Sequence, residues 1–188
     1  MMRAAVLVQD GYRLATQDKP DLARAIELFS MARELNPDIK FYNLPEASLD
    51  DPQRYARSLV VGKLLEQGRG LAQQGDVAGA TAKFKEALAL DPGLGIEPEA
   101  EAKRVYAPKM IEQGRALAEQ GDIAGATAKF EEALALDPSL DIKPEVEAKR
   151  IYAPKVVEEG HSLMKQGDIV GAVAEVRGGV GARSRPGQ

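Results

Sequence analysis

Two stretches of the chain are almost identical. "QGDVAGATAKFKEALALDP" runs from Gln74 to Pro92, and "QGDIAGATAKFEEALALDP" runs from Gln120 to Pro138. When residues 67–112 are aligned with residues 113–158, the two segments differ at only 11 of 46 positions. Self-similarity at a fixed period indicates a chain built from repeated units.

The spacing inside each stretch is typical of a helix. Ala126, Phe130 and Ala133 stand at i, i+4 and i+7, which is one face of a helix. Small residues on such a face let a second helix approach closely, and the Phe ring fills the space beside them. Gly114 and Leu117 supply a matching face on the segment before it. Each copy is therefore predicted to be a helical hairpin.

The residues between and after the two predicted helices suit helix ends. Gly121 can end the first helix in a left-handed conformation, and the Asp122 carboxylate can cap the second. Asp137–Pro138 then stops the second helix, because proline cannot continue it.

Two weaker copies flank this pair, at residues 10–37 and 159–176. All share a Gly followed three positions later by Leu, and then an Ala. In the first three copies Phe, Ala and Pro follow at fixed spacing. The members are Gly11, Leu14, Ala25, Phe29, Ala32, Pro37; Gly68, Leu71, Ala80, Phe84, Ala87, Pro92; Gly114, Leu117, Ala126, Phe130, Ala133, Pro138; and Gly160, Leu163, Ala172. In the fourth copy Val176 stands where Phe is expected. Because one hairpin cannot bury both of its apolar faces, stacked hairpins are expected.

This skeleton resembles the tetratricopeptide repeat (TPR), whose pattern is L-G-x2-Y, eight residues, A-x3-F-x2-A-x4-P. The resemblance covers roughly residues 10–176. It implies an all-α fold, a right-handed α-α superhelix (a TPR-like solenoid) of about four hairpins. Two features depart from the pattern. The usual Tyr is Leu in every copy, and the period is 46 residues instead of about 34.

The additional residues of each period are predicted to form extra linker helices. Pro98 and Pro144 suit the first turn of a helix. Pro108 and Pro154 follow ten residues later, so each segment is either one long kinked helix or two helices at an angle. The kinked helix is favoured. The first linker, residues 38–58, is longer and is expected to be irregular.

The predicted organisation has five parts. They are a first hairpin with its long linker (1–58), a second hairpin plus linker helix (59–107), a third hairpin plus linker helix (108–153), a partial fourth repeat (154–176) and a disordered tail (177–188). The tail has four Gly and no helical period. The alternative is a flexible segment whose arginines contact an acidic partner.

Composition argues against several classes of function. The net charge is −4 and the pI is about 5.2, which disfavours nucleic acid and anionic membranes as partners. There is no Cys and a single His, His161. No catalytic, cofactor-binding or metal-binding set is predicted, and the chain is expected not to be an enzyme. Its longest apolar run, Ala4–Val8, is too short for a membrane span. A cytoplasmic location is expected.

The remaining hypothesis is a scaffold that binds a peptide or protein segment. The TPR resemblance implies that the first helix of each hairpin lines a concave face. The candidate partner-binding residues there are Tyr12, Arg69, Arg115 and His161, with the aliphatic Leu65, Ile111 and Val157. Arginines can bind an acidic peptide through bidentate contacts. The simpler reading, which is favoured, is that the arginines are solvated and recur because the units were duplicated.

A second hypothesis is self-assembly. A short fourth copy would leave Leu163, Met164, Ile169 and Val173 poorly covered, and repeat arrays need polar terminal units. The chain would then form a homo-oligomer through its repeat ends, alone or as part of a longer multidomain protein.

Overall fold

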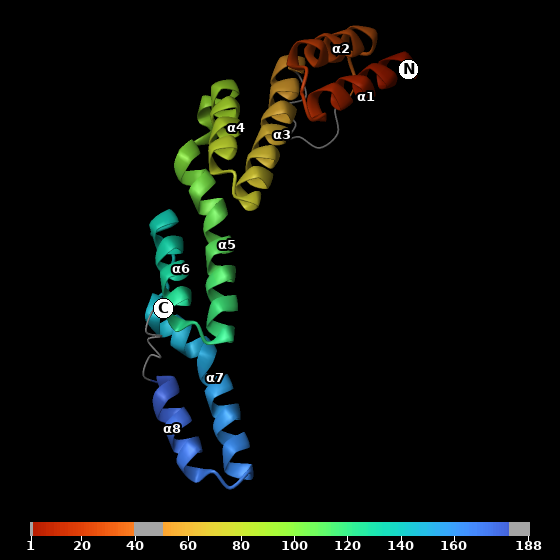
Figure 1. The fold of residues 1–188 in the computed structure, drawn as a ribbon. Helices are drawn as coiled ribbons and strands as arrows, with labels where there is room; N and C mark the ends of the chain where they lie inside the picture. The colour runs from red at the N-terminus through yellow and green to blue at the C-terminus, as the bar shows by residue number, and fades with distance from the viewer. Residues whose placement is uncertain (1, 40–50, 181–188) are drawn as a thin grey trace. The chain divides into compact units, whose positions relative to one another are not determined.

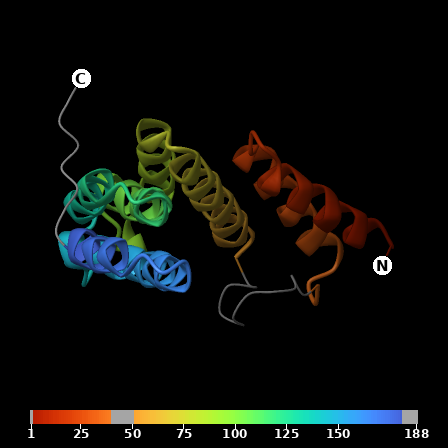
Figure 2. The same ribbon diagram turned by 60° about the horizontal axis from the view of Figure 1, so that its bottom comes forward.

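The computed structural model describes residues 2–39 and 51–180, and within these ranges every regular element is a helix (Figures 1 and 2). The α-helices are α1 (Met2–Thr16), α2 (Leu22–Leu35), α3 (Pro52–Gln74), α4 (Val77–Leu90), α5 (Pro98–Gln120), α6 (Ile123–Leu136), α7 (Pro144–Lys165) and α8 (Ile169–Val180). A short 3₁₀ turn, Pro92–Leu94, follows α4. The all-α prediction is confirmed for the described residues.

The chain divides into two compact units, Met1–Ala102 and Lys103–Gln188. In the first unit α1 and α2 form a hairpin, α3 packs against both, and α4 packs back on α3. Aromatic and small aliphatic residues fill its core, where the rings of Phe29 and Tyr55 meet edge to face at 4.8 Å between centroids. The buried members of this core are Ala15, Ala25, Phe29, Tyr55, Ala56, Val60, Val61, Leu64 and Ala87.

In the second unit α6 and α8 both pack against α7. Its core cluster is smaller and consists of Ala118, Ala126, Phe130 and Ala148. Five partly buried aliphatic side chains surround it: Ile111, Leu117, Ile123, Ile142 and Ile151. Ala148 and Ile151 lie in the first turns of α7, so the start of this long helix belongs to the core of the hairpin before it.

The predicted match between Gly and Phe is confirmed in three copies. Phe29, Phe84 and Phe130 are fully buried. A Cβ atom added to Gly11, Gly68 or Gly114 would lie 2.8, 2.6 or 2.7 Å from the Cε1 atom of the facing ring. The glycine therefore leaves the space that the phenylalanine ring occupies, and the two helices of the hairpin are fixed in register.

The turns between hairpin helices follow one design. Gly75, Gly121 and Gly167 have φ angles of 99°, 89° and 83°, a region in which side chains with a Cβ are strained. Each ends the preceding helix in a Schellman arrangement, for example Gly121 N–H to the Ala118 carbonyl and Asp122 N–H to the Leu117 carbonyl, both 2.9 Å. The prediction that Gly121 ends the helix is confirmed.

An aspartate caps each following helix. The carboxylate of Asp122 accepts a hydrogen bond from Gly125 N–H at 2.9 Å, and Asp76 and Asp168 cap α4 and α8 in the same way at 2.8 Å. A Cβ at Gly125 would lie 2.4 Å from the Oδ2 atom of the capping aspartate. The glycine three residues after the cap thus gives the carboxylate the space that it needs.

Proline begins the long helices and is also accommodated within them. Pro98 and Pro144 are the first residues of α5 and α7, as predicted. Pro108 and Pro154 lie inside these helices, which remain continuous. The alternative of two separate helices is therefore wrong. The predicted boundaries between repeat units, at 58/59, 107/108 and 153/154, fall within α3, α5 and α7.

Two further predictions need correction. Residues 52–58, expected to be irregular, are helical, because the Asp51 carboxylate accepts hydrogen bonds from the N–H groups of Gln53 and Arg54 and starts α3. Residues 177–180, expected to be disordered, complete α8, which packs on α7 through the buried Ala172. The rest of the predicted linker, 40–50, and of the predicted tail, 181–188, lies outside the described residues.

None of the described helices combines the length and the apolar character needed to cross a membrane.

Candidate functional site

The predicted partner-binding residues lie on the long helices and on α1. Tyr12 is on α1, Leu65 and Arg69 are on α3, Ile111 and Arg115 are on α5, and Val157 and His161 are on α7. The side chains of Tyr12, Arg69, Arg115, Val157 and His161 are exposed. Leu65 and Ile111 are partly buried, and each packs against the core of its own unit. These two side chains therefore hold helices together.

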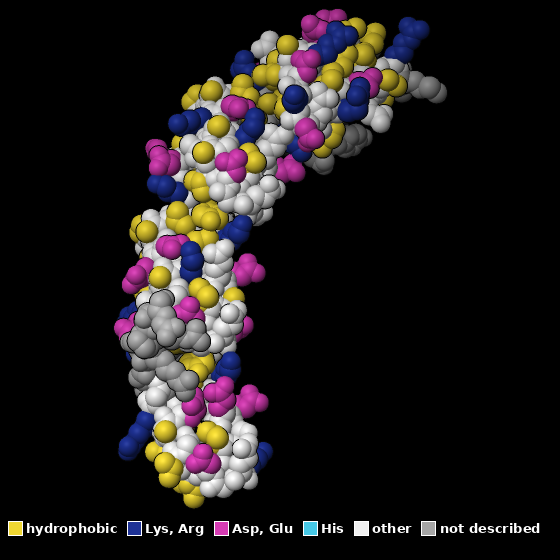
Figure 3. Space-filling model, in the orientation of Figure 1, with side chains coloured by type: hydrophobic (Ala, Val, Ile, Leu, Met, Phe, Trp, Pro, Cys, Tyr) yellow, Lys and Arg dark blue, Asp and Glu magenta, His cyan; other side chains and the backbone are white. Residues whose placement is uncertain are grey.

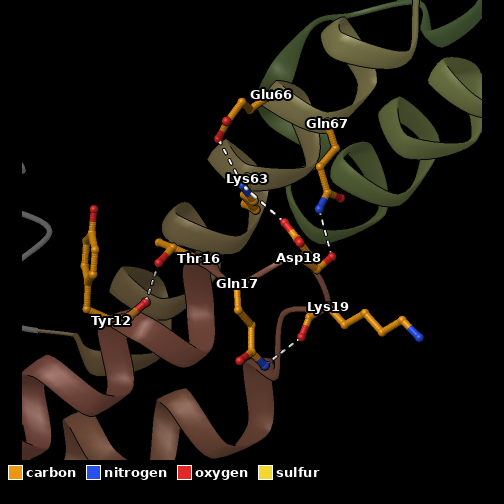
Figure 4. Close-up of polar contacts among 8 residues, drawn as sticks. All are labelled: Tyr12, Thr16, Gln17, Asp18, Lys19, Lys63, Glu66 and Gln67. Atoms are coloured by element: carbon orange, nitrogen blue, oxygen red, sulfur yellow. Dashed lines mark hydrogen bonds and ion pairs between the residues drawn. The ribbon is translucent and has the colours of Figure 1, made fainter.

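Around Tyr12, the polar contacts join the turn after α1 to α3 (Figure 4). The Gln67 side chain donates a hydrogen bond of 2.8 Å to the Asp18 carbonyl. Lys63 lies 3.9 Å from the Asp18 carboxylate and 3.5 Å from that of Glu66. Tyr12 takes part through its carbonyl, which accepts a 2.8 Å hydrogen bond from the Thr16 hydroxyl. These contacts position α3 on the first hairpin.

Arg115 belongs to a group of charges with Glu147 and Arg150. The hydrogen bonds from Arg150, at 3.0 and 2.7 Å, lower the pKa of Glu147, and the charges of Arg150 and Arg115 lower it further. A lowered pKa in the folded protein means that this carboxylate adds stability above its unfolded pKa. The contribution is lost as the pH falls through the lower, folded value. The charge of Arg115 therefore acts on the first turn of α7, at the carboxylate that precedes Ala148.

The structure brings Val157 and His161 together at an apolar groove between α7 and α8. The groove has a volume of about 410 Å³. It is lined by Val157, Gly160, His161, Met164, Ile169, Ala172, Val173, Val176 and Arg177. Hydrophobic side chains lie on the surface over this hairpin in the space-filling view (Figure 3). A groove of this size and character is suited to apolar side chains from a partner.

The large aliphatic residues of this hairpin are exposed to an unusual degree. Ile169 is 67% exposed, Met164 59%, Val157 50% and Val173 49%. The prediction that Met164, Ile169 and Val173 would be poorly covered is confirmed, whereas Leu163 is partly buried. Contiguous exposed apolar surface marks interaction sites more often than scattered single residues do.

Sequence reasoning did not identify the groove itself. Its origin lies in the pair Gly160 and Val176, which replaces the Gly–Phe pair of the other hairpins. A Cβ at Gly160 would meet the Cγ2 atom of Val176 at 3.1 Å, so the valine occupies the place of the ring but fills less of it. The loss of Phe beside a retained Gly was the signal that could have found this site.

A second cavity of about 430 Å³ lies in the first unit. It is lined by Asp51, Arg54, Arg57, Ser58, Val61, Leu90 and Asp91. Two arginines and two aspartates leave the lining without a net charge, and it contains none of the predicted partner-binding residues. In the part of the chain that the structure describes, no group of three or more His, Cys, Asp or Glu side chains is placed to hold a metal ion.

Comparison with protein-family models finds no match for this chain, and comparisons with curated proteins and with solved structures find no significant match.

Proposed function

We propose that the chain is a non-catalytic helical-repeat scaffold, of the kind that TPR proteins represent, which binds a peptide or protein segment. The observation that carries this proposal is the apolar groove between α7 and α8, where Val157 and His161 lie together. Its apolar floor and its basic rim of His161 and Arg177 suit a segment with apolar anchors and nearby acidic residues.

A photo-crosslinking amino acid at the exposed position 157 tests the proposal in cells of the source organism. We expect crosslinks to a defined segment of another protein, identified by mass spectrometry, and their loss when Val173→Glu is added. The double variant Arg69→Glu, Arg115→Glu tests the two arginines among the predicted partner-binding residues. Crosslinks that this variant leaves unchanged would assign binding to the groove and not to the arginines. Crosslinks that survive Val173→Glu at full yield would contradict a role for the groove.

The second candidate function is self-assembly of the chain through the same hairpin. The exposed Val170 (82%) and its neighbours Ile169 and Val173 on α8 favour it. Light scattering behind a sizing column, over a wide range of concentration, tests it. A dimer or larger species that disappears in Val170→Glu would support self-assembly, and a 20.2 kDa monomer at every concentration would exclude it.

A further inference from the structure

The residues that line the groove between α7 and α8 correspond, one repeat later, to residues of the core cluster of the same unit, which the start of α7 covers. Five residues that line the groove stand 46 positions after five members of the second unit's core. They are Val157, Met164, Ile169, Ala172 and Val176, and their counterparts are Ile111, Ala118, Ile123, Ala126 and Phe130. The core cluster therefore shows which kind of side chain packs against residues at these positions.

In the second unit the occupant is the first part of α7. Ala148 is fully buried in the cluster, and Ile151 packs beside it. A small residue at the centre lets the backbone of α7 come close, and the β-branched residue three positions later fills the space next to it. Glu147 precedes the alanine, and the nearby charge of Arg115 helps to lower the pKa of its carboxyl group. The counterpart of Arg115 in the last hairpin is His161.

The first unit repeats the alanine and the aliphatic residue of this arrangement, with Tyr55 in the place of Glu147. Ala56 is fully buried at the start of α3, and Leu59, three positions later, packs against the same core. The residues at the five equivalent positions again belong to the core: Val8, Ala15, Leu22, Ala25 and Phe29. The equivalent alanine of α5, Ala102, is fully buried as well. In both units, therefore, the apolar groove of a hairpin is covered by the first turns of the following long helix, with an alanine at the middle of the contact.

The groove between α7 and α8 differs from the covered grooves at two positions. Met164 stands in the place of Ala118 and Ala15, and Val176 stands in the place of Phe130 and Phe29. Methionine is flexible and fills irregular space, while valine leaves room beside Gly160. The lining remains apolar, with His161 and Arg177 as the charged or titratable groups at its edge.

We propose that the groove between α7 and α8 binds an amphipathic α-helix supplied by a partner. Its pattern is an acidic residue, an alanine and an aliphatic residue three positions after the alanine. This inference rests on the proposed binding function and specifies its ligand. The acidic residue approaches His161, the alanine faces Met164 and Ala172, and the aliphatic residue enters the space beside Val176.

The chain itself contains a probe with this pattern. A fluorescein-labelled peptide of residues 141–154, "DIKPEVEAKRIYAP", is titrated with the full chain and followed by fluorescence anisotropy. We expect saturable binding that Val173→Glu weakens by about tenfold or more, because the groove must then bury a carboxylate. Val6→Glu is the matched control, since Val6 is exposed to a similar degree (56%) but lies on α1; it should bind as the unmodified chain does.

Matched peptides test the proposed pattern. Ala148→Glu in the peptide should abolish binding, whereas Val146→Glu, at a position that is 60% exposed in α7, should leave most of it. The proposal is wrong if the unmodified peptide does not saturate, or if Val173→Glu and Val6→Glu bind equally well.

Two further outcomes separate this inference from the proposed function. If the peptide fails to bind while crosslinks from position 157 still reach another protein, the binding function stands and the helix pattern is wrong. If the peptide fails and the chain alone forms a dimer that Val173→Glu dissociates, the occupant is a second copy of the chain, and the proposed partner helix is wrong.

Discussion

At the scale of single residues, the fold depends on the pairing of a glycine with a phenylalanine. The chain has 18 glycines, and neighbouring ones in the same helix can have opposite roles. Gly68 faces the ring of Phe84, whereas a Cβ at Gly70, two residues later in α3, would meet nothing within 4 Å. The two positions therefore form an internal comparison between a glycine that packing requires and one that it does not.

We expect Gly68→Ala to lower the free energy of unfolding and Gly70→Ala to raise it. The added methyl group at position 68 would lie 2.6 Å from Phe84 Cε1, and overpacking of this kind costs roughly 1–3 kcal/mol. At position 70 the better helix propensity of alanine contributes about 0.5–1 kcal/mol. Urea unfolding followed by circular dichroism measures both, and equal midpoints for the two variants would contradict the pairing.

The same residue scale explains what could be predicted from the sequence. Phe130, Gly114 and Ala126 recur at fixed spacing, so their packing was predictable from periodicity alone. The groove was not, because it arises from the difference in size between valine and phenylalanine at position 176, together with the exposure of Met164. Periodicity identifies which positions face a core, but it does not show whether another helix covers them.

At the scale of the elements, helix ends are set by short polar signals. Asp76, Asp122 and Asp168 each follow a left-handed glycine and cap the next helix. These ends were predictable from the letters Gln-Gly-Asp. The continuity of α5 and α7 through Pro108 and Pro154 was favoured by the sequence but not decided by it, because a proline inside a helix removes one N–H donor and crowds the carbonyl four residues earlier, which kinks some helices and breaks others.

We expect Asp122→Ala to lower the free energy of unfolding by about 1 kcal/mol, the usual effect of removing an N-cap. The hydrogen bond from Gly125 N–H is lost, and an orphan donor is left at the start of α6. Asp141→Ala is the control, because Asp141 is exposed and lies between helices. Thermal unfolding followed by circular dichroism checks this, and equal melting temperatures for the two variants would show that the cap is dispensable.

At the scale of the whole molecule, the hairpins differ in what covers them. The first part of α3 packs on α1 and α2, and the first part of α7 packs on the core to which α6 contributes. The last hairpin instead exposes the groove between α7 and α8. Local stability is expected to follow this difference, since segments with few buried apolar contacts open most readily.

Hydrogen exchange measured by mass spectrometry can test this expectation. We expect backbone amides in α8 to exchange about tenfold faster than those in α6, or more, because α6 is covered on the face that α8 exposes. The helix α6 is a close internal control, as it begins with the same capping motif. Equal protection of the two helices would mean that the face of α8 is covered in solution.

The long helices α3 and α7 each contact two neighbours: the first part of each packs on the hairpin before it, and the second part forms a hairpin with the helix after it. One period of 46 residues therefore carries a whole set of both kinds of contact. Unequal recombination between the two near-identical segments would join Glu66 to Gln113, the same Glu–Gln step that already occurs at Glu112–Gln113. The number of units can consequently change in evolution by whole periods, without any junction that the chain does not already contain.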